Sequence, residues 1–502
     1  MQIELQMNSP QLPWVVQKYG GTSVGKFLNE IADTIIPKYL KTNRVAIVCS
    51  ARSGVTKEKG TTNRLLRAAK EAITEGSKEH LNIVKEIRDD HINAARSVIK
   101  NPEILSVLED QLEKDCLKLK SFLEAAEIIE EISARSKDII VGMGEKLSCT
   151  IIAAVLKDRG IDSQLVVLSN IINQEFTTLD QSFYDYVAGR LKEIIHDCGN
   201  RVPVLTGFFG YVPGSLLNSI GRGYTDLCAA LAAVGLQSQE LQIWKEVDGI
   251  FTADPRKINT ARLLPIITPE EAAELTYYGS EVIHPFTMEQ VIRAEIPIRI
   301  KNVENPSGVG SIIFPDSLKR NGSATPPPSP EVLAQNGYHK DLSRKRPAAV
   351  TVKDKICVLN IQSNRKNVSH GFLAKIFTIL DEHNIVVDLI STSQINVSMA
   401  LSIDVTENSL SRALVELERL GTVDVIRDMA IVSLVGKQMK NMIGIAGEMF
   451  SSVAEAGVSL EMISQGASEI NISCVVKEKH ALSALKAIHQ KLLDADPNLD
   501  TV

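Results

Sequence analysis

Short apolar runs alternate with helical patterns along the N-terminal part of the chain. The runs are rich in Val, Ile and Leu and are bounded by Gly, Asn or Asp, which is typical of buried β-strands. The segments between them, including 149–160 and 226–236, repeat their apolar residues with a helical period. This alternation predicts an α/β fold, a mostly parallel sheet with helices on both faces. The predicted strands lie in WVVQKY, RVAIVCSA, DSQLVVLS, RVPVLTGFFGYV, ELQIWKEV and IPIRIKNV.

One long segment departs from this alternation. From residue 71 to residue 134, mixed acidic and basic residues carry a helical period, which predicts a helical insertion on the sheet. After it, the apolar stretch before Gly144 predicts a further strand, and Gly144-Glu145-Lys146 predicts the start of a helix. An acidic residue in a first helical turn also suits the helix dipole, so Glu145 has a purely structural explanation at this point.

The composition changes after Pro315. The segment that follows is rich in Pro, Ser, Lys and Arg and poor in large apolar residues, which predicts a linker. Beyond it, two stretches share the order helix, turn, strand, turn, strand, which predicts a tandem α+β repeat with paired sheets. The predicted organisation is an N-terminal tail at 1–13, an α/β domain at 14–318, the linker at 319–348 and two α+β domains at 349–426 and 427–495.

Composition and charge exclude several classes of protein. Hydrophobic residues make up 44% and charged residues 23% of the 502 residues, as in globular proteins of about three domains. A net charge of −6 argues against a nucleic-acid binder. Neither a membrane-spanning run nor a secretory signal is expected. The seven scattered cysteines form no C-x-x-C pair, which favours a cytoplasmic protein with reduced thiols and no zinc site.

The first glycine-rich segment, QKYGGTSVGKF, follows the first predicted strand. It contains G-x-x-x-x-G-K, but Phe27 stands where a phosphate-binding P-loop has the Ser or Thr that binds magnesium. The segment therefore either binds phosphate in another way, with Lys18 as its cation, or is a tight turn without a ligand. Taken alone, it favours the tight turn.

A second glycine-rich segment, GRGYTD, precedes a predicted helix. Here Arg222 lies between glycines, Thr225 is expected to cap the helix, and Asp226 falls in its first turn. A helix N-terminus attracts anions, and a planar guanidinium suits a carboxylate or phosphate. Asp226 is equally well explained as an acid that complements the helix dipole.

Taken in order, these segments resemble the aspartate kinase family. The resemblance rests on KYGGTS, VCSARSGVT, GEKLS, GFFGYVPG, GRGYTD, VDGIFTADPR and YYGSEVIHP, and it covers nearly the whole chain. WKEVDGI, ELTYYGSEVIHPF and SHGFLAKIFTILD suggest the fungal, monofunctional branch. The C-terminal repeat resembles the tandem ACT domains of that family.

The resemblance implies an amino-acid kinase fold and transfer of the ATP γ-phosphoryl group to L-aspartate, giving 4-phospho-L-aspartate, with Mg²⁺ held mainly by phosphates. It assigns Lys18 to the phosphates in the transition state and Asp226 to positioning Lys18 and the substrate ammonium; no direct metal ligand is assigned. The implied substrate-binding residues are Ser50, Thr62, Glu145, Arg222 and Thr225, and the implied nucleotide-binding residues are Lys18, Gly20, Gly21, Thr22, Ser23, Lys245, Glu246, Phe251 and Arg256.

Some positions depart from the bacterial pattern of the family. Lys245-Glu246 stands where many relatives have Thr-Asp, and Glu281 replaces a nucleotide-binding lysine, so the nucleotide contacts there stay open. The remaining alternatives are another carboxylate kinase of this fold and a non-catalytic amino-acid sensor.

For the regulatory half, the resemblance implies feedback inhibition by L-threonine and ACT-mediated homodimers or homotetramers. The implied effector-binding residues are Ser369, Gly371, Phe372, Leu373, Asp388 and Ser393.

Overall fold

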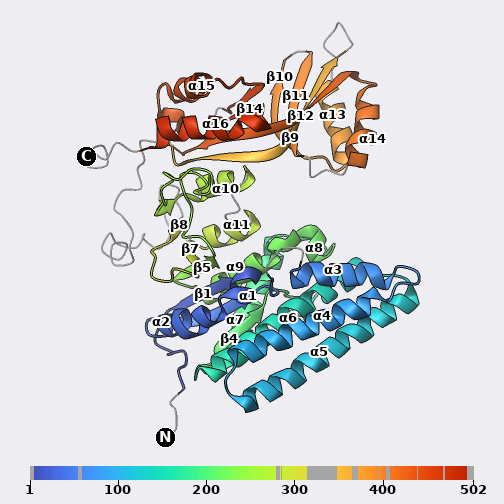
Figure 1. Ribbon diagram of the computed structural model, residues 1–502, viewed down its shortest axis with the longest axis vertical. Helices are drawn as coiled ribbons and strands as arrows, with labels where there is room; N and C mark the ends of the chain where they lie inside the picture. The colour runs from blue at the N-terminus through green and yellow to red at the C-terminus, as the bar shows by residue number, and fades with distance from the viewer. Residues whose placement is uncertain are drawn as a thin grey trace. The chain divides into compact units, whose positions relative to one another are not determined.

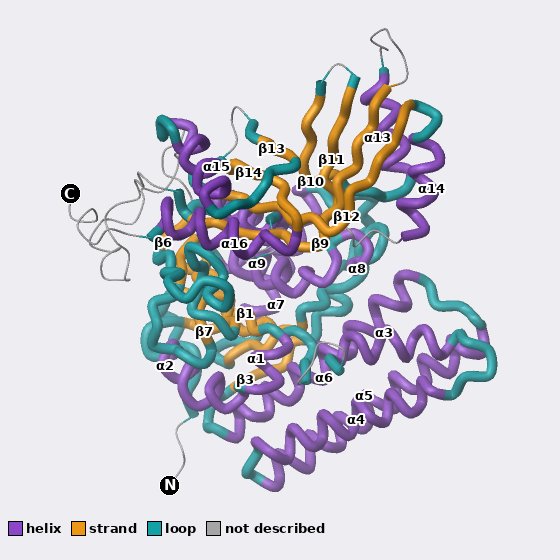
Figure 2. Tube along the Cα trace, turned by 45° about the horizontal axis from the view of Figure 1, so that its top comes forward, coloured by secondary structure: helices purple, strands orange, loops and turns teal. Residues whose placement is uncertain are grey.

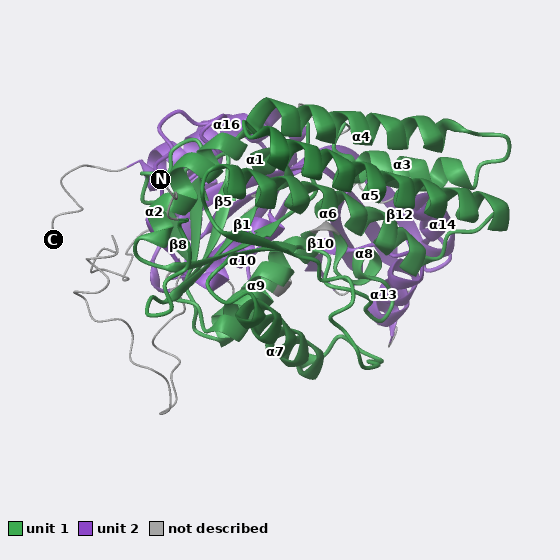
Figure 3. Cartoon of the chain, turned by 90° about the horizontal axis from the view of Figure 1, so that it is seen from below, with its two compact units in different colours: residues 1–250, 283–327 green, residues 251–282, 328–502 purple. Residues whose placement is uncertain are grey.

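The chain folds into two compact units, and each is described by itself (Figure 3). The first comprises residues 1–250 and 283–327, and the second comprises residues 251–282 and 328–502. The computed structural model describes residues 5–54, 59–278, 283, 285–313, 347–363, 371–393, 395–402, 407–437, 439–466 and 470–494. The predicted linker therefore lies almost entirely outside the described residues.

A mostly parallel sheet forms the centre of the first unit. Its strands are β1 (Trp14–Tyr19), β2 (Arg44–Cys49), β3 (Ser163–Val166), β4 (Val202–Thr206), β5 (Glu240–Lys245), β7 (Ile298–Asn302) and β8 (Ser311–Ile313). They run in the order β3-β4-β2-β1-β5-β7-β8, and β8 is antiparallel to β7. Val45, Ala46 and Ile47 of β2 are all fully buried, as expected for a parallel strand covered on both faces. The predicted strands are confirmed.

The carboxyl ends of neighbouring strands meet at one edge of this sheet. Lys18 of β1 pairs in register with Val48 of β2 and with Ile243 of β5. Cys49, the last residue of β2, pairs with Thr206, the last residue of β4. Open α/β sheets bind their ligands outside this edge, so the register brings the predicted catalytic segments to one place.

Helices cover the sheet of the first unit and form the predicted insertion beside it (Figures 1 and 2). They are α1 (Gly21–Lys26), η1 (Glu30–Ile35), α2 (Ile36–Leu40), α3 (Thr61–Ala72), α4 (Glu79–Val98), α5 (Pro102–Ile129), α6 (Ala134–Asp158), α7 (Gln181–Asp197), α8 (Leu216–Ser219), η2 (Gly221–Gly223), α9 (Tyr224–Leu236) and α11 (Pro285–Arg293). Helix α6 packs on β2, β3 and β4, whereas α9 packs on β1, β2 and β5. Helices α3, α4 and α5 stack beside α6, which confirms the helical insertion.

Helix α6 corrects one prediction. The expected strand before Gly144 and helix start at Glu145 are wrong, because the helix begins at Ala134 and carries Glu145 in its middle. The Ser133 hydroxyl caps the helix by accepting the Ser136 N–H at 3.1 Å, so the apolar run continues in helical phase. By length and composition alone α6 could cross a membrane, but 72% of its most apolar window is buried inside the unit, as in a core helix.

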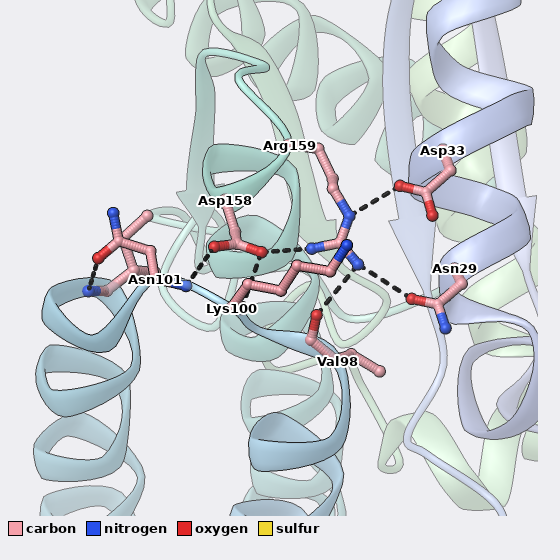
Figure 4. A network of polar contacts seen from close by, with 8 residues as sticks. Asn29, Asp33, Val98, Lys100, Asn101, Asp158 and Arg159 are labelled. Carbon is pink, nitrogen blue, oxygen red and sulfur yellow. Dashed lines mark hydrogen bonds and ion pairs between the residues drawn. The ribbon is translucent and has the colours of Figure 1, made fainter.

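A polar network fixes the base of the α4–α5 insertion against the rest of the first unit (Figure 4). Arg159, at the end of α6, donates to Asp33 at 2.7 Å and to Asn29 and the Val98 carbonyl, each at 3.0 Å. Asp158 accepts the N–H groups of residues 100 and 101, which join α4 to α5. The two neighbouring side chains therefore tie three separate segments together.

An antiparallel sheet forms the centre of the second unit. Its strands are β9 (Ala349–Ser363), β10 (Val387–Thr392), β11 (Asn396–Ser402), β12 (Gly421–Val435), β13 (Met462–Ser464) and β14 (Asn471–Lys477), in the order β10-β11-β9-β12-β14-β13. The helices are α13 (Phe372–Glu382), α14 (Glu407–Leu417), η4 (Met439–Asn441), α15 (Ile445–Glu455), α16 (Glu478–Ile488) and η5 (His489–Leu493). The paired sheets of the tandem repeat are confirmed. Each repeat has one more helix, α14 or α16, than the sequence predicts.

The two repeats share one diagnostic backbone position. Gly371 precedes α13 with φ +83°, and Gly444 precedes α15 with φ +88°. A left-handed backbone conformation costs glycine little free energy, so a glycine precedes the helix in each repeat. The positions are equivalent in the aligned repeats, so the two repeats share the same backbone geometry at the start of this helix.

Residues 251–282 belong to the second unit, although the sequence places them inside the predicted domain at 14–318. They include β6 (Ile266–Ile267) and α10 (Pro269–Tyr277). A hydrogen bond of 2.9 Å joins the Thr252 hydroxyl to His489 Nε2, and the Val350 N–H donates to the Thr252 carbonyl at 2.8 Å. Arg262 donates to the Leu493 carbonyl at 2.9 Å. The segment is thus held by the C-terminal sheet and its last helices.

We expect Arg159→Met to lower the stability of the first unit by about 1–3 kcal/mol, because a largely buried guanidinium that donates charge-assisted hydrogen bonds to separate segments is lost. Arg159→Lys should rescue only part of this loss, since an ammonium cannot reproduce the planar fork. Urea unfolding followed by circular dichroism measures the change. Arg96→Met is the control, because Arg96 pairs with Glu109 at the surface. A shift no larger than that of the control would contradict the role of the network.

Candidate functional site

A pocket opens at the strand-end edge of the first unit. It has a volume of about 160 Å³, which suits a ligand smaller than a drug-sized molecule. One side is formed by residues that follow β2 and lead into α3, and the other by α6 and the start of α9. The lining residues are Ser50, Ala51, Arg52, Ser53, Gly60, Thr61, Thr62, Asn63, Glu145, Tyr224 and Thr225. The predicted substrate residues Ser50, Thr62, Glu145 and Thr225 are therefore brought together.

The carboxylate of Glu145 is the most deeply buried charge in this pocket's lining. The Thr225 hydroxyl donates to Oε1 at 2.7 Å, and the Phe208 N–H donates to Oε2. Burial raises the pKa of Glu145 to about 7, although the donors from Thr225 and Phe208 and the charge of Lys18 act in the opposite direction. A carboxylate with this pKa can accept an ammonium group at neutral pH.

Lys18 and Asp226 form an ion pair beside this carboxylate. Lys18 is near the end of β1, and its Nζ lies 2.7 Å from Asp226 Oδ1 in the first turn of α9. Both side chains keep some exposure, 12% and 20%, so the pair is not sealed in the core. When a carboxylate holds the lysine ammonium in place through one N–H group, the other N–H groups of the lysine stay available for a second anion. The two predicted catalytic residues are therefore in direct contact with each other.

Thr225 differs from its predicted position. It is not the cap of α9, because the helix begins at Tyr224 and Gly223 precedes it. Thr225 instead lies within the first turn, and its hydroxyl bonds Glu145. The side chain that was expected to bond its own helix therefore bonds α6.

The segment after β1 forms the short helix α1 instead of an extended loop. A Cβ on Gly21 would lie 2.4 Å from the Ala51 carbonyl oxygen, and one on Gly25 would lie 2.0 Å from that of Ser53. These two glycines are required because the backbone of α1 lies against residues 51–53. Gly20 has only Lys18 Nζ near its Cβ position, at 3.9 Å. The P-loop-like spacing therefore reflects packing against a neighbouring segment.

Glu246 holds this helix from the end of β5. The Ser23 hydroxyl is fully buried and donates to Glu246 Oε1 at 2.8 Å. Thr22 precedes it in the first turn of α1 and is partly exposed. Both Ser23 and Glu246 are predicted nucleotide residues, and here they contact each other. Lys245, next to Glu246, ends β5 and is partly exposed.

The segment that carries Arg222 is anchored by Asp138 of α6. Arg222 lies in η2, and its side chain is outside the described part of the structure. Asp138 accepts the Ser215 hydroxyl at 2.9 Å and the Leu216 N–H at 2.7 Å, just before η2. Ser215 has φ +83°, a conformation that costs a non-glycine residue free energy. One helix, α6, therefore positions both the Arg222 segment and Glu145.

Seven of the lining residues are not among the predicted site residues, and three of these seven have large or polar side chains of interest. Arg52 and Tyr224 line the pocket, and so does Thr61. Thr61 is fully buried, and within the described residues its hydroxyl has no hydrogen-bond partner, which marks it as a group that a ligand could satisfy. Their positions next to Ser50, Thr62 and Thr225 were the available signal.

The remaining predicted residues lie in the second unit or outside the residues that the structure describes. Phe251 forms a bridge with Leu263, and Arg256 is exposed and paired with Asp254 at 2.9 Å. For the effector set, Gly371, Phe372 and Leu373 form the start of α13, Asp388 pairs with Lys353 at 2.6 Å, and the Ser393 N–H donates to the Asn396 carbonyl. Ser369 and Glu281 lie outside the described residues.

Comparison with protein families gives two matches. The model of the amino acid kinase family matches residues 13–302, and a model of the ACT domain matches residues 432–492. The first match spans the residues of the pocket and the Lys18–Asp226 pair. The second covers the later of the two C-terminal repeats.

Known proteins resemble the chain over almost its full length. It is 57% identical to the aspartokinase of Schizosaccharomyces pombe over 97% of this chain and 94% of that protein. It is 53% identical to the aspartokinase of Saccharomyces cerevisiae over 99% of this chain and 96% of that protein.

Solved structures agree. E. coli aspartokinase III in complex with aspartate and ADP, in its R-state, has a TM-score of 0.71 and 26% identity, and the match covers 96% of this chain and 100% of that one. The same enzyme with lysine and aspartate, in its T-state, has a TM-score of 0.72 and 25% identity, over 96% and 99% of the two chains. The chain belongs to the aspartokinase family, with an amino acid kinase fold followed by ACT repeats.

Proposed function

We propose that this enzyme transfers the γ-phosphoryl group of ATP to the β-carboxylate of L-aspartate, giving 4-phospho-L-aspartate and ADP. The observation that carries the proposal is the buried Glu145 carboxylate in a small pocket beside the Lys18–Asp226 pair. A fixed negative charge next to a cation suits a substrate that presents an ammonium group and a carboxylate. The family to which the chain belongs supports the same reaction.

The chemical step needs alignment more than acid–base catalysis. The β-carboxylate is already ionised at neutral pH, so one of its oxygens attacks the γ-phosphorus without a general base. The bond from that phosphorus to the β,γ-bridging oxygen breaks, and the electron pair leaves with ADP. Lys18 stabilises the charge on the transferred phosphoryl oxygens, and Asp226 holds Lys18 in position.

The substrate is held by charges of both signs. Glu145 takes the α-ammonium group, and Arg222 of η2 takes the α-carboxylate. The hydroxyls of Ser50 and Thr62 line the opposite wall and donate to the remaining oxygens. Thr225 keeps the Glu145 carboxylate oriented by donating to it from α9.

ATP and Mg²⁺ fit the residues on this edge of the sheet. The start of α1 with Gly20 and Gly21, together with Lys18, would face the phosphates. The described residues contain no cluster of three or more His, Cys, Asp or Glu side chains suited to a metal. Mg²⁺ would be held mainly by phosphates and water, where it neutralises phosphate charge.

The C-terminal repeats are proposed to sense L-threonine and to inhibit the kinase by feedback, as the first step of a route to threonine and methionine. The support is the paired ACT-type sheet and the exposed glycine start of α13, where Gly371 has open space around its Cβ position. Assembly into homodimers or homotetramers through these repeats and a cytoplasmic location belong to the same proposal.

We expect the wild-type enzyme to release ADP with L-aspartate and ATP, and not with glutamate or acetylglutamate. Lys18→Ala should lower kcat by about 100- to 1,000-fold, because charge on the transferred phosphoryl group loses its fixed partner. A coupled ADP-release assay measures both. Lys26→Ala is the matched control, since Lys26 is exposed at the end of α1 and should be dispensable. Near-normal turnover of Lys18→Ala would overturn its assignment.

Aspartate binding should weaken as the pH falls through about 7, because protonated Glu145 cannot pair with an ammonium group. The ionised fraction of a group with that pKa drops about threefold between about pH 7.5 and about pH 6.5, and affinity should follow it. Calorimetry without nucleotide avoids the titration of ATP. Glu145→Gln should bind weakly at every pH and lose this acid limb. An unchanged pH profile in Glu145→Gln would show that another group titrates.

Threonine should inhibit the enzyme, and Gly371→Asp or Ser393→Leu should relieve the inhibition while leaving basal activity intact. At Gly371 an aspartate tolerates the left-handed backbone better than most residues and meets open space, so the fold should survive. Gly444→Asp, at the equivalent position of the second repeat, is the matched control and should keep inhibition. Activity against threonine concentration decides the matter, and full inhibition in both test variants would move the effector site elsewhere.

A further inference from the structure

Arg52 is an unassigned cation in the wall of the substrate pocket. It follows Ala51 at the end of β2, and its side chain is 17% exposed. Nη1 donates to Asp90 Oδ2 at 2.7 Å, and Nη2 donates to the Gly25 carbonyl of α1 at 3.3 Å. These contacts use two of the five N–H donors of a guanidinium, so donors remain for a ligand. Arg52 therefore links the pocket to α1, the helix that follows β1 and Lys18.

The anchor of Arg52 comes from the helical insertion. Asp90 lies on α4, and its Oδ2 also accepts from Arg64 Nη2 at 3.1 Å. Burial opposes ionisation of Asp90, but the charge and hydrogen bond of Arg52, with Arg64, hold the pKa of this carboxyl below its usual value. One carboxylate thus faces two guanidinium groups. The cluster has a positive excess, and of its two arginines only Arg52 lines the pocket.

Among the described residues, the neighbouring His91 and Glu145 leave this excess in place. His91, next to Asp90, is fully buried, and burial lowers its pKa to about 4, so it is neutral at physiological pH. Its Nδ1 bonds the Ile87 carbonyl at 2.7 Å and does not compete for Asp90. Glu145 is in the pocket wall but is held by Thr225 and the Phe208 N–H. The positive charge of Arg52 that Asp90 does not neutralise therefore faces the ligand in the pocket.

A dicarboxylic amino acid has one ammonium group and two carboxylates. Under the proposed function, on which this inference rests, Glu145 takes the ammonium group and Arg222 the α-carboxylate, which leaves the side-chain carboxylate without a cation. We propose that Arg52 binds this side-chain carboxylate, the acceptor of the phosphoryl group, and that Asp90 is a positioning residue that holds the Arg52 fork toward the pocket.

The arrangement also explains what the insertion contributes to the site. Arg52 can present its donors in one orientation only if its other edge is fixed, because a free arginine side chain loses much rotamer entropy on binding. Asp90 fixes that edge from α4, and the network around Arg159 fixes the base of α4 and α5. Specificity for an ionised side chain is thus built by two segments far apart in sequence.

The test compares aspartate with asparagine, which keeps the α-groups but has a neutral side chain. Arg52→Gln should raise the KM for aspartate about tenfold or more, as expected for a lost charge-assisted hydrogen bond. The KM for ATP and competitive inhibition by asparagine should change less than about twofold. Arg52→Lys should recover part of the loss, and Asp90→Asn should raise the aspartate KM by a smaller factor.

Arg64→Gln is the matched control, because Arg64 shares Asp90 but does not line the pocket. It should leave the aspartate KM within about twofold of wild type. Equal weakening of aspartate and asparagine in Arg52→Gln, or a loss in Arg64→Gln as large as in Arg52→Gln, would overturn the proposal. If Arg52→Gln does not fold, Arg52→Lys and Asp90→Asn carry the same comparison. Failure of the wild-type enzyme to phosphorylate aspartate would instead overturn the proposed function.

Discussion

The burial of the Glu145 carboxylate is the constraint on which the rest of the site depends. A charge taken out of water must be compensated, and here the compensation comes from separate elements: the Thr225 hydroxyl on α9 and the Phe208 N–H after β4. Helix α6 can carry Glu145 into this position only if α9 and the end of β4 meet it there. The same helix anchors the Arg222 segment through Asp138, so α6 sets the spacing of the whole pocket.

Close backbone packing sets the other side of the site. Gly21 and Gly25 allow α1 to touch residues 51–53, which places the end of β2 beside the segment that follows β1. Lys18 then lies between these segments and Asp226. The site therefore has one side fixed by a buried charge and another fixed by the absence of side chains.

The sequence predicted the elements well where apolar periodicity was strong. The strands of the first unit and the tandem repeat are confirmed, because buried parallel strands and amphipathic helices have distinct patterns. Glu145 was misplaced at a helix start, since the β-branched run before it is equally compatible with a strand and with a buried helix. Arg52 was missed because its importance comes from Asp90, and a sequence does not show that residues 52 and 90 are neighbours.

The glycine segment shows a different limit. Its spacing imitates a P-loop, and only the contact with residues 51–53 reveals why Gly21 and Gly25 are needed. The family resemblance predicts Lys18, Asp226 and Glu145 as site residues, and the structure brings them to one edge of the sheet. The identity of the charged site residues is thus predictable from the family pattern. The need for Gly21 and Gly25 is seen only in the packing of α1 against residues 51–53.

The assignment of residues 251–282 to the second unit has a consequence for how this enzyme can be divided. Thr252 and Arg262 are bonded to His489 and Leu493 near the end of the chain, so part of the kinase sequence folds as part of the regulatory module. Cutting the chain at the predicted linker would strip this segment of its partners. The second unit is therefore not encoded by the C-terminal half of the sequence alone. If it were fused to another kinase, residues 251–282 would have to be transferred with it.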